Sequence, residues 1–83
     1  MFNYYFTFGS DKRFPFQMGY VIVKANDQVS ACKVFKAYFP NRPGSDCLNC
    51  SFVYNEEEFM KYWETVWNKT TCHGIIEFKS AAI

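Results

Sequence analysis

The sequence predicts an α+β fold: a two-layer sandwich of element order ββαβαβ, with two helices on one face of a four-stranded mixed sheet. Three observations predict it. Apolar residues alternate with a period of two in the first segment. Two later segments carry apolar residues at helical spacing, each directly after a capping residue. The 83 residues contain no linker, so we expect a single domain over residues 1–83.

The first two strands are expected at residues 2–8 and 18–24, joined by a long loop that contains Pro15. In the first, one face is strongly apolar and the other more polar. In the second, the run 20–23 is apolar on both faces, which indicates a central position in the sheet.

Two helices are predicted from the residues that can cap their N-termini. Asn26 or Asp27 provides a side-chain oxygen for the free amides of a first helix, which Pro40 ends. Asn55 caps a second helix, and the three glutamates at residues 56–58 place negative charge at its positive end. The buried stripe of this helix is expected to contain Phe59, Tyr62 or Trp63, Val66 and Trp67.

The two remaining strands are expected at residues 51–54 and 75–79, after the loop 41–46 and a turn at residues 72–74. In the last strand, Ile76 and Phe78 would face inward. If the second helix is a crossover between parallel strands, both of these strands start at the same end of the sheet.

Composition excludes several classes of protein. Aromatic residues make up 22% of the chain, enough for a core without a metal or a disulfide. The net charge of +1 does not indicate binding to nucleic acid or to an anionic membrane. We find no leader peptide and no apolar run long enough to span a bilayer, so a cytoplasmic protein with reduced cysteines is expected.

Four residues form the candidate metal site. Cys47 and Cys50 have the two-residue spacing with which a turn presents two thiolates to zinc, and Cys72 and His73 are a possible second half. Adjacent ligands rarely reach one tetrahedral ion, so ordinary thiols and a redox pair remain alternative interpretations. Cys32 lies on the apolar stripe of the first helix and is expected in the core.

No catalytic constellation is present in the sequence. His73 is the only histidine, and nothing in its spacing supplies an orienting carboxylate or a nucleophile. The glutamates at 56–58 are expected to be a solvated first helical turn. No glycine-rich phosphate loop is present, so we predict a non-enzymatic protein without a cofactor, zinc excepted.

Aromatic residues around the first two strands are the candidate binding surface. Tyr5 on the more polar strand face, Phe14 and Phe16 in the loop, and Arg42 in the second long loop are the predicted partner-binding residues. Exposed aromatics mark protein interfaces, whereas an aromatic sheet face can also stack nucleobases. The element order differs from that of an RNA-recognition motif, so a protein partner or self-association is favoured over nucleic acid.

The sequence resembles small uncharacterised proteins encoded in prophages and conjugative elements of low-GC Gram-positive bacteria. Three segments carry the resemblance: Tyr4-Tyr5-Phe6-Thr7-Phe8-Gly9-Ser10-Asp11, Phe14-Pro15-Phe16-Gln17 before Gly19-Tyr20, and Cys47-Leu48-Asn49-Cys50 before Phe52-Val53-Tyr54. The resemblance implies an accessory protein of a mobile genetic element, one that binds a host or rival protein and inhibits, for example, a host defence system. It transfers no functional residue.

The sequence thus predicts a protein-interaction module. It acts through the hairpin of the first two predicted strands, which is rich in aromatic residues, and through the loop from Asn41 to Cys50. The alternative is a small zinc-stabilised nucleic-acid-binding module.

Overall fold

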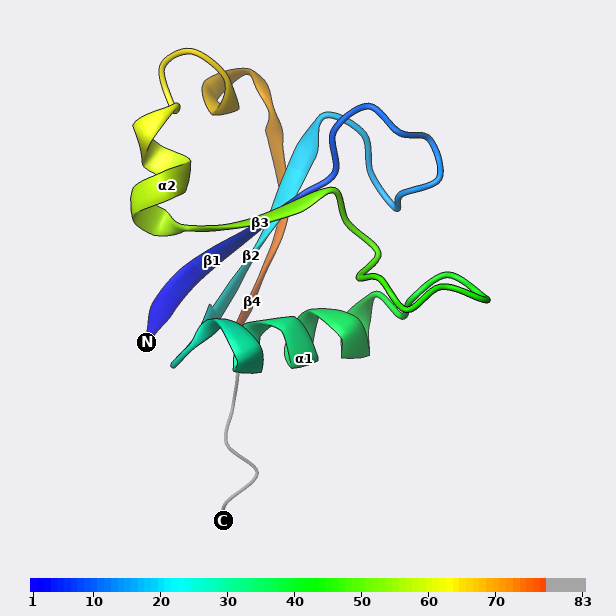
Figure 1. Cartoon of the computed structure of the whole chain (residues 1–83). Helices are drawn as coiled ribbons and strands as arrows, with labels where there is room; N and C mark the ends of the chain where they lie inside the picture. The colour runs from blue at the N-terminus through cyan, green and yellow to red at the C-terminus, as the bar shows by residue number, and fades with distance from the viewer. Residues whose placement is uncertain (78–83) are drawn as a thin grey trace.

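The computed structural model describes residues 1–77 (Figure 1). The elements follow the predicted order, with one short 3-10 turn before the last strand. They are β1 (Phe2–Thr7), β2 (Gly19–Ala25), α1 (Gln28–Tyr38), β3 (Phe52–Asn55), α2 (Glu56–Lys61), the 3-10 turn (Trp67–Lys69) and β4 (Thr71–Glu77).

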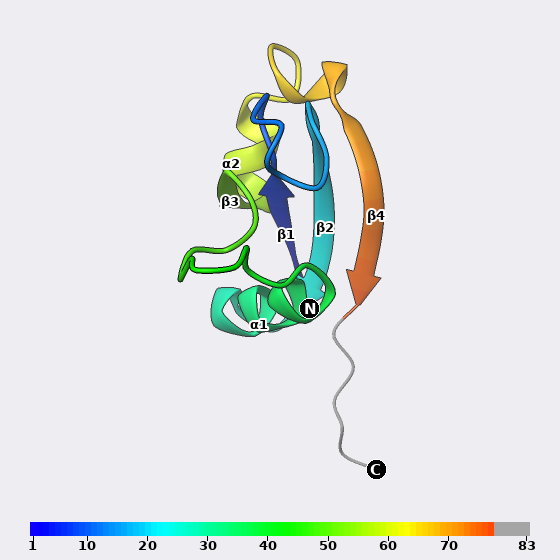
Figure 2. The same ribbon diagram turned by 90° about the vertical axis from the view of Figure 1, so that its right-hand side faces the viewer.

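The four strands form one mixed sheet in the order β3-β1-β2-β4. β1 is antiparallel to both β2 and β3, whereas β2 and β4 are parallel. In Figure 2, β1 points up and β4 points down alongside β2. The fold class, the mixed sheet and the central position predicted for β2 are therefore confirmed.

The two helices pack on opposite faces of the sheet, so the predicted two-layer arrangement with both helices on one face is wrong. Phe6 of β1 stacks on Phe35 of α1, with ring centroids 4.3 Å apart. Its neighbour Tyr5 stacks on Phe59 of α2, with centroids 4.0 Å apart. Because consecutive strand residues point to opposite faces, the sheet lies between α1 and α2, as Figure 1 shows. The face that contains Tyr5 and Thr7 is buried too.

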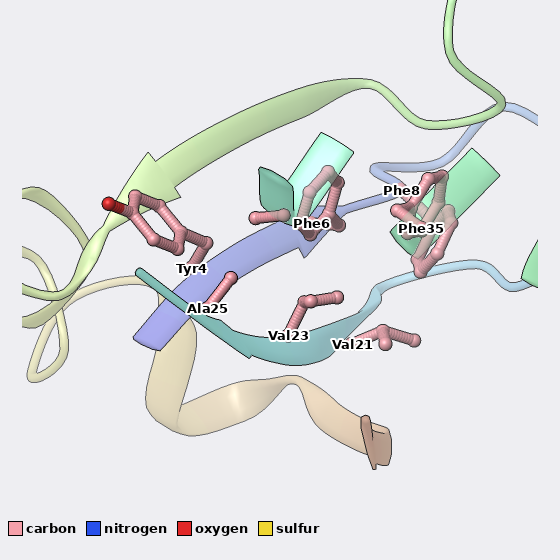
Figure 3. Packing of buried hydrophobic residues seen from close by; sticks show 8 residues of the cluster. Tyr4, Phe6, Phe8, Val21, Val23, Ala25 and Phe35 are labelled. Carbon is pink, nitrogen blue, oxygen red and sulfur yellow. The ribbon is translucent and has the colours of Figure 1, made fainter. Parts of the chain in front are cut away.

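The larger of two buried clusters lies between the sheet and α1 (Figure 3). The side chain of Asp27 accepts a hydrogen bond from the Ser30 amide at 2.7 Å and so caps α1, as predicted. The helix ends at Tyr38, two residues before Pro40. The buried members of the cluster are Tyr4, Phe6, Phe8, Val21, Val23, Ala25, Ala31 and Phe35.

The smaller cluster lies between the sheet and α2 and consists of Tyr5, Tyr20 and Phe59. A capping box starts α2: Asn55 accepts from the Glu58 amide, and the Glu58 side chain accepts from the Asn55 amide. The helix has only six residues, whereas its predicted stripe continued to Trp67. Residues 63–67 contain two tryptophans and two β-branched residues, which propagate a helix weakly.

β4 begins four residues earlier than predicted, because the expected turn at residues 72–74 is part of the strand. Tyr20 pairs with Cys72 and Ile22 with Ile75, so β4 holds one extra residue at this point. The irregularity is a β-bulge next to Gly74, and glycine suits a bulge. The predicted residues 78 and 79 of this strand, Phe78 included, lie outside the described residues.

Candidate functional site

The predicted metal ligands lie at opposite edges of the sheet. Cys47 and Cys50 precede β3, and Cys72 and His73 belong to β4. β3 and β4 do start at the same end, but β1 and β2 separate them. Three strand spacings of about 4.8 Å separate these two edge strands by roughly 14 Å. Among residues 1–77, no group of three or more His, Cys, Asp or Glu side chains is arranged to hold a metal ion.

His73 has a packing role. Its imidazole stacks on the Phe16 ring, with centroids 4.1 Å apart and planes 4° from parallel. The ring also lies directly over Gly19, where a Cβ atom would come within 2.8 Å of the Thr71 carbonyl oxygen and closer still to the imidazole. Gly19 is therefore required by the close approach of β4 to β2.

The cysteines are separate thiols with different surroundings. Cys47 and Cys72 are exposed, whereas Cys32 and Cys50 are half-buried against the α1 cluster. Burial, with a smaller effect of the nearby Cys32, raises the pKa of the Cys50 thiol to about 12. Burial also raises the pKa of Cys32. A raised pKa keeps both groups protonated at neutral pH, which is the opposite of what a reactive cysteine needs.

The predicted partner-binding residues are mostly structural. Tyr5 was expected on the surface, but only 6% of it is exposed, since α2 covers its face of the sheet. Phe14 and Phe16 are half-buried against the α1 cluster. The Arg42 guanidinium lies 5.1 Å from the centre of the Phe14 ring, so these two residues tie the two long loops together.

An apolar hollow of about 400 Å³ lies between the hairpin loop and the segment that follows α2. Sequence reasoning missed this feature, because it expected residues 65–67 within a continuous helix. The only charged side chain in its lining is Lys69. We call this feature the Met18 hollow; it is lined by Gly9, Met18, Gly19, Thr65, Val66, Trp67, Lys69 and Thr70.

Met18 has an unusual backbone at the edge of this hollow. Its φ is 54°, the only positive φ at a non-glycine position among residues 1–77. The conformation is fixed on both sides: the Met18 amide donates to the Gly9 carbonyl at 2.6 Å, and its own carbonyl accepts from the Thr71 amide at 3.3 Å. A left-handed conformation costs a side-chain-bearing residue about 1–2 kcal/mol. The side chain nevertheless remains 57% exposed.

Trp67 forms the inner wall of the Met18 hollow. Its ring stacks on Phe59, with centroids 5.0 Å apart, and lies 5.5 Å from the Tyr54 ring. The indole nitrogen is buried and finds no acceptor among the described residues. A donor left without an acceptor destabilises the folded state by about 1–3 kcal/mol. Val66, beside it, is 44% exposed.

Comparisons with models of protein families, with curated proteins and with solved structures find no match to this chain. No helix within residues 1–77 combines the length and the apolar character needed to cross a membrane.

Proposed function

We propose that this protein is a non-enzymatic protein-interaction module that binds an apolar segment of a partner protein in the Met18 hollow. The observation that carries the proposal is Met18 itself. A methionine that is strained at φ 54° and 57% exposed contributes little to the stability of the fold. A glycine there would relieve the strain, so the side chain is best explained by a contact outside the chain.

The composition of the hollow supports a protein partner. Methionine and tryptophan are enriched at the centres of protein interfaces, where methionine adapts its shape to the opposing surface. Met18, Val66 and Trp67 supply this apolar centre. Lys69 adds one positive charge, which favours a partner segment that bears an acidic residue next to its apolar one.

Two observations favour this reading over nucleic-acid binding. The face of the sheet that was a candidate for stacking bases is covered, since Phe59 of α2 packs on Tyr5 and Tyr20. The Tyr5 hydroxyl donates to a Glu56 carboxylate oxygen at 3.3 Å, and negative charge at this position repels phosphate. A zinc-stabilised module lacks a converging set of ligands among residues 1–77.

The biological setting of the proposal rests on the resemblance to proteins of prophages and conjugative elements. In that setting the partner is a component of a host or rival machine, such as a defence complex, and binding inhibits it. Binding in a hollow of this size engages one or two side chains of the partner.

The test compares two methionine variants as bait in cells of a low-GC Gram-positive host. Met18→Gly removes the exposed side chain and the strain together, so we expect an unchanged or higher melting temperature. A partner captured by the wild-type protein should bind Met18→Gly about 10- to 100-fold more weakly, because the contact of one apolar side chain is lost. Met60→Ala is the control, since Met60 is 49% exposed on α2, outside the hollow. Equal capture by both variants and the wild type would contradict the proposal.

A further inference from the structure

An apolar groove of about 380 Å³ lies between α1 and the loop that precedes β3. Val29, Cys32 and Lys36 are three or four positions apart on α1, so they share one side of the helix. The loop contributes Leu48. We call this feature the α1 groove; it is lined by Gln28, Val29, Cys32, Lys33, Lys36 and Leu48. Its volume is in the range of small-molecule sites.

A second groove, of about 420 Å³, adjoins the first and follows β3. Gln28 and Leu48 line both grooves, so the two form one continuous surface. We call the second one the β3 groove; its other lining residues are Cys47, Cys50, Ser51, Phe52 and Val53. Within residues 1–77, none of the residues in its lining is charged. The β3 groove is therefore an uncharged extension of the α1 groove.

The floor of this surface belongs to the core. Four of the lining side chains are half-buried against the α1 cluster: Cys32, Leu48, Cys50 and Val53. Core packing fixes their positions, so the apolar floor exists before any ligand binds. At the rim, Val29 is 67% exposed, although it is apolar and lies on the first turn of α1. A ligand that removes this surface from water binds with a favourable hydrophobic contribution.

Positive charge is confined to one part of this surface. Lys33 and Lys36 lie on the second and third turns of α1, whereas the β3 groove adjoins the helix at Gln28 on its first turn. Lys36 is about 12 Å from Gln28 along the helix, at a rise of about 1.5 Å per residue. The aliphatic part of a lysine can line an apolar groove while its ammonium group stays at the rim. The surface thus has a cationic end and an uncharged end.

No carboxylate belongs to the described lining of the α1 groove. The nearby acid is Asp27: the hydrogen bond from Ser30, and to a smaller extent the charge of Lys33, lower the pKa of its carboxyl. That carboxylate caps α1 through the Ser30 amide and lies outside the groove lining. Neither Lys33 nor Lys36 forms an ion pair within residues 1–77. Both ammonium groups are therefore available to an anion outside the chain.

We propose that the two grooves together bind one molecule of a long-chain carboxylic acid. Its carboxylate lies at Lys33 and Lys36, and its acyl chain passes Leu48 into the β3 groove. Charge and shape argue for this occupant, because a molecule with one anionic end and one uncharged apolar chain is complementary to the surface described. An acidic helix of a partner protein fits less well. It presents its anchors along one straight line, whereas this surface turns from the side of α1 to the edge of the sheet.

The experiment titrates the reduced, isotope-labelled protein with laurate below its critical micelle concentration and follows the backbone amide shifts by NMR. We expect a dissociation constant below about 1 mM, with the shifts confined to α1 and residues 47–53. Decanoate, which is two methylene groups shorter, should bind about fourfold more weakly, because a chain in an open groove is about half buried. Dodecyltrimethylammonium, which has a positive head on the same chain, should bind at least about tenfold more weakly than laurate.

Variants of surface residues separate the charge from the apolar contact. The double variant Lys33→Gln and Lys36→Gln should bind laurate about tenfold more weakly. Lys61→Gln on α2 is its matched control and should bind laurate as the wild type does. Val29→Glu places a carboxylate in the groove and should also weaken binding about tenfold. Glutamate suits the first turn of a helix, so this variant should fold. Its control is Tyr38→Glu, at a 64% exposed position of α1 outside both grooves.

Several outcomes would overturn the proposal. They are equal binding of laurate and dodecyltrimethylammonium, an unchanged affinity in the double lysine variant, and shifts that occur only at residues 65–70. Binding of an acidic amphipathic peptide or of phosphatidylglycerol vesicles, without binding of monomeric laurate, would also overturn it and would assign the surface to a protein or to a membrane. The Met18 hollow shares no lining residue with either groove, so Met18→Gly should bind laurate as the wild type does, and the two proposals can fail separately.

Discussion

Tyr5 joins the central strand to the start of α2 by two different contacts. Its ring stacks on Phe59, and its hydroxyl donates to the Glu56 carboxylate at 3.3 Å. Burial raises the pKa of the Tyr5 hydroxyl, and the neighbouring negative charge of Glu56 raises it further. The hydroxyl therefore stays a proton donor to Glu56 throughout the neutral range.

Replacing Tyr5 should separate these contacts. We expect Tyr5→Ala to lower the free energy of unfolding by about 3–5 kcal/mol, because it leaves a cavity under α2. Tyr5→Phe should cost only about 1 kcal/mol, the value of one hydrogen bond. Urea unfolding followed by tryptophan fluorescence measures both, with Ile75→Ala, at a 62% exposed position of another strand, as the control. A Tyr5→Ala variant as stable as this control would contradict the packing described for α2.

Because of Cys50, the free energy of unfolding should depend on pH in the alkaline range. Its pKa is raised from about 9 to about 12, so between these values the unfolded chain loses the thiol proton while the native chain keeps it. The unfolded state is then favoured, and the free energy of unfolding falls as pH rises above 9. The free energy of unfolding should fall by less than about 1.4 kcal/mol per pH unit, because solvent screens the half-buried thiol.

Comparing two cysteine variants isolates this effect. Under reducing conditions, Cys50→Ala should lose less stability between pH 9 and 11 than the wild type does. Cys47→Ala, which alters an exposed thiol, should keep the wild-type dependence. Urea titrations at three pH values between 8 and 11 give the slopes. Parallel slopes for the wild type and Cys50→Ala would show that the thiol titrates as in the unfolded chain.

At the scale of elements, α2 is short and depends on one side chain. Phe59 is fully buried between Tyr5, Tyr20 and Trp67, whereas its neighbour Met60 is 49% exposed. Six residues are too few for a helix that is stable without tertiary contacts. The capping box fixes where α2 begins, and Phe59 fixes it to the sheet.

Adjacent substitutions in α2 should therefore differ widely. Phe59→Ala is expected to lower the free energy of unfolding by about 3–5 kcal/mol. Met60→Ala should change it by less than about 0.5 kcal/mol, because the side chain is largely solvated. Thermal unfolding by circular dichroism compares the two. Equal effects would mean that α2 does not pack on the sheet through Phe59.

Local sequence signals explain which elements were predictable. Asp27, Pro40 and Asn55 act through contacts within a few residues, so the limits of α1 and the start of α2 followed from the sequence. The end of α2 and the start of β4 depend on distant partners. Trp67 leaves the helix to stack on Phe59 and Tyr54, and residues 71–74 extend as a strand because β2 lies beside them.

At the scale of the whole molecule, the features that the sequence did not predict depend on the order of the strands in the sheet. Cys47 and Cys72 both precede or begin a strand at the same end of the sheet, as expected, yet they belong to opposite edges. Alternation of polar and apolar residues in β1 suggested one solvated face, but Tyr5 and Thr7 are both buried. A helix on each face follows from the connection through α2, which places Phe59 over the face opposite α1. The Met18 hollow could not be predicted from the sequence, because no sequence pattern indicates a positive φ at a methionine.

The strand order also has a consequence for the folding pathway. β1 and β2 are neighbours in the chain, but Tyr5 pairs with Tyr54 and Gly19 with Thr71 across about fifty positions, and closing such long loops is entropically costly. We therefore expect the central hairpin to form in the transition state and both edge strands to join after it. In stopped-flow experiments, Val23→Ala in β2 should slow refolding, whereas Ile76→Ala in β4 should mainly speed unfolding. If Ile76→Ala slows refolding as much as Val23→Ala does, the parallel edge is already in place at the rate-limiting step.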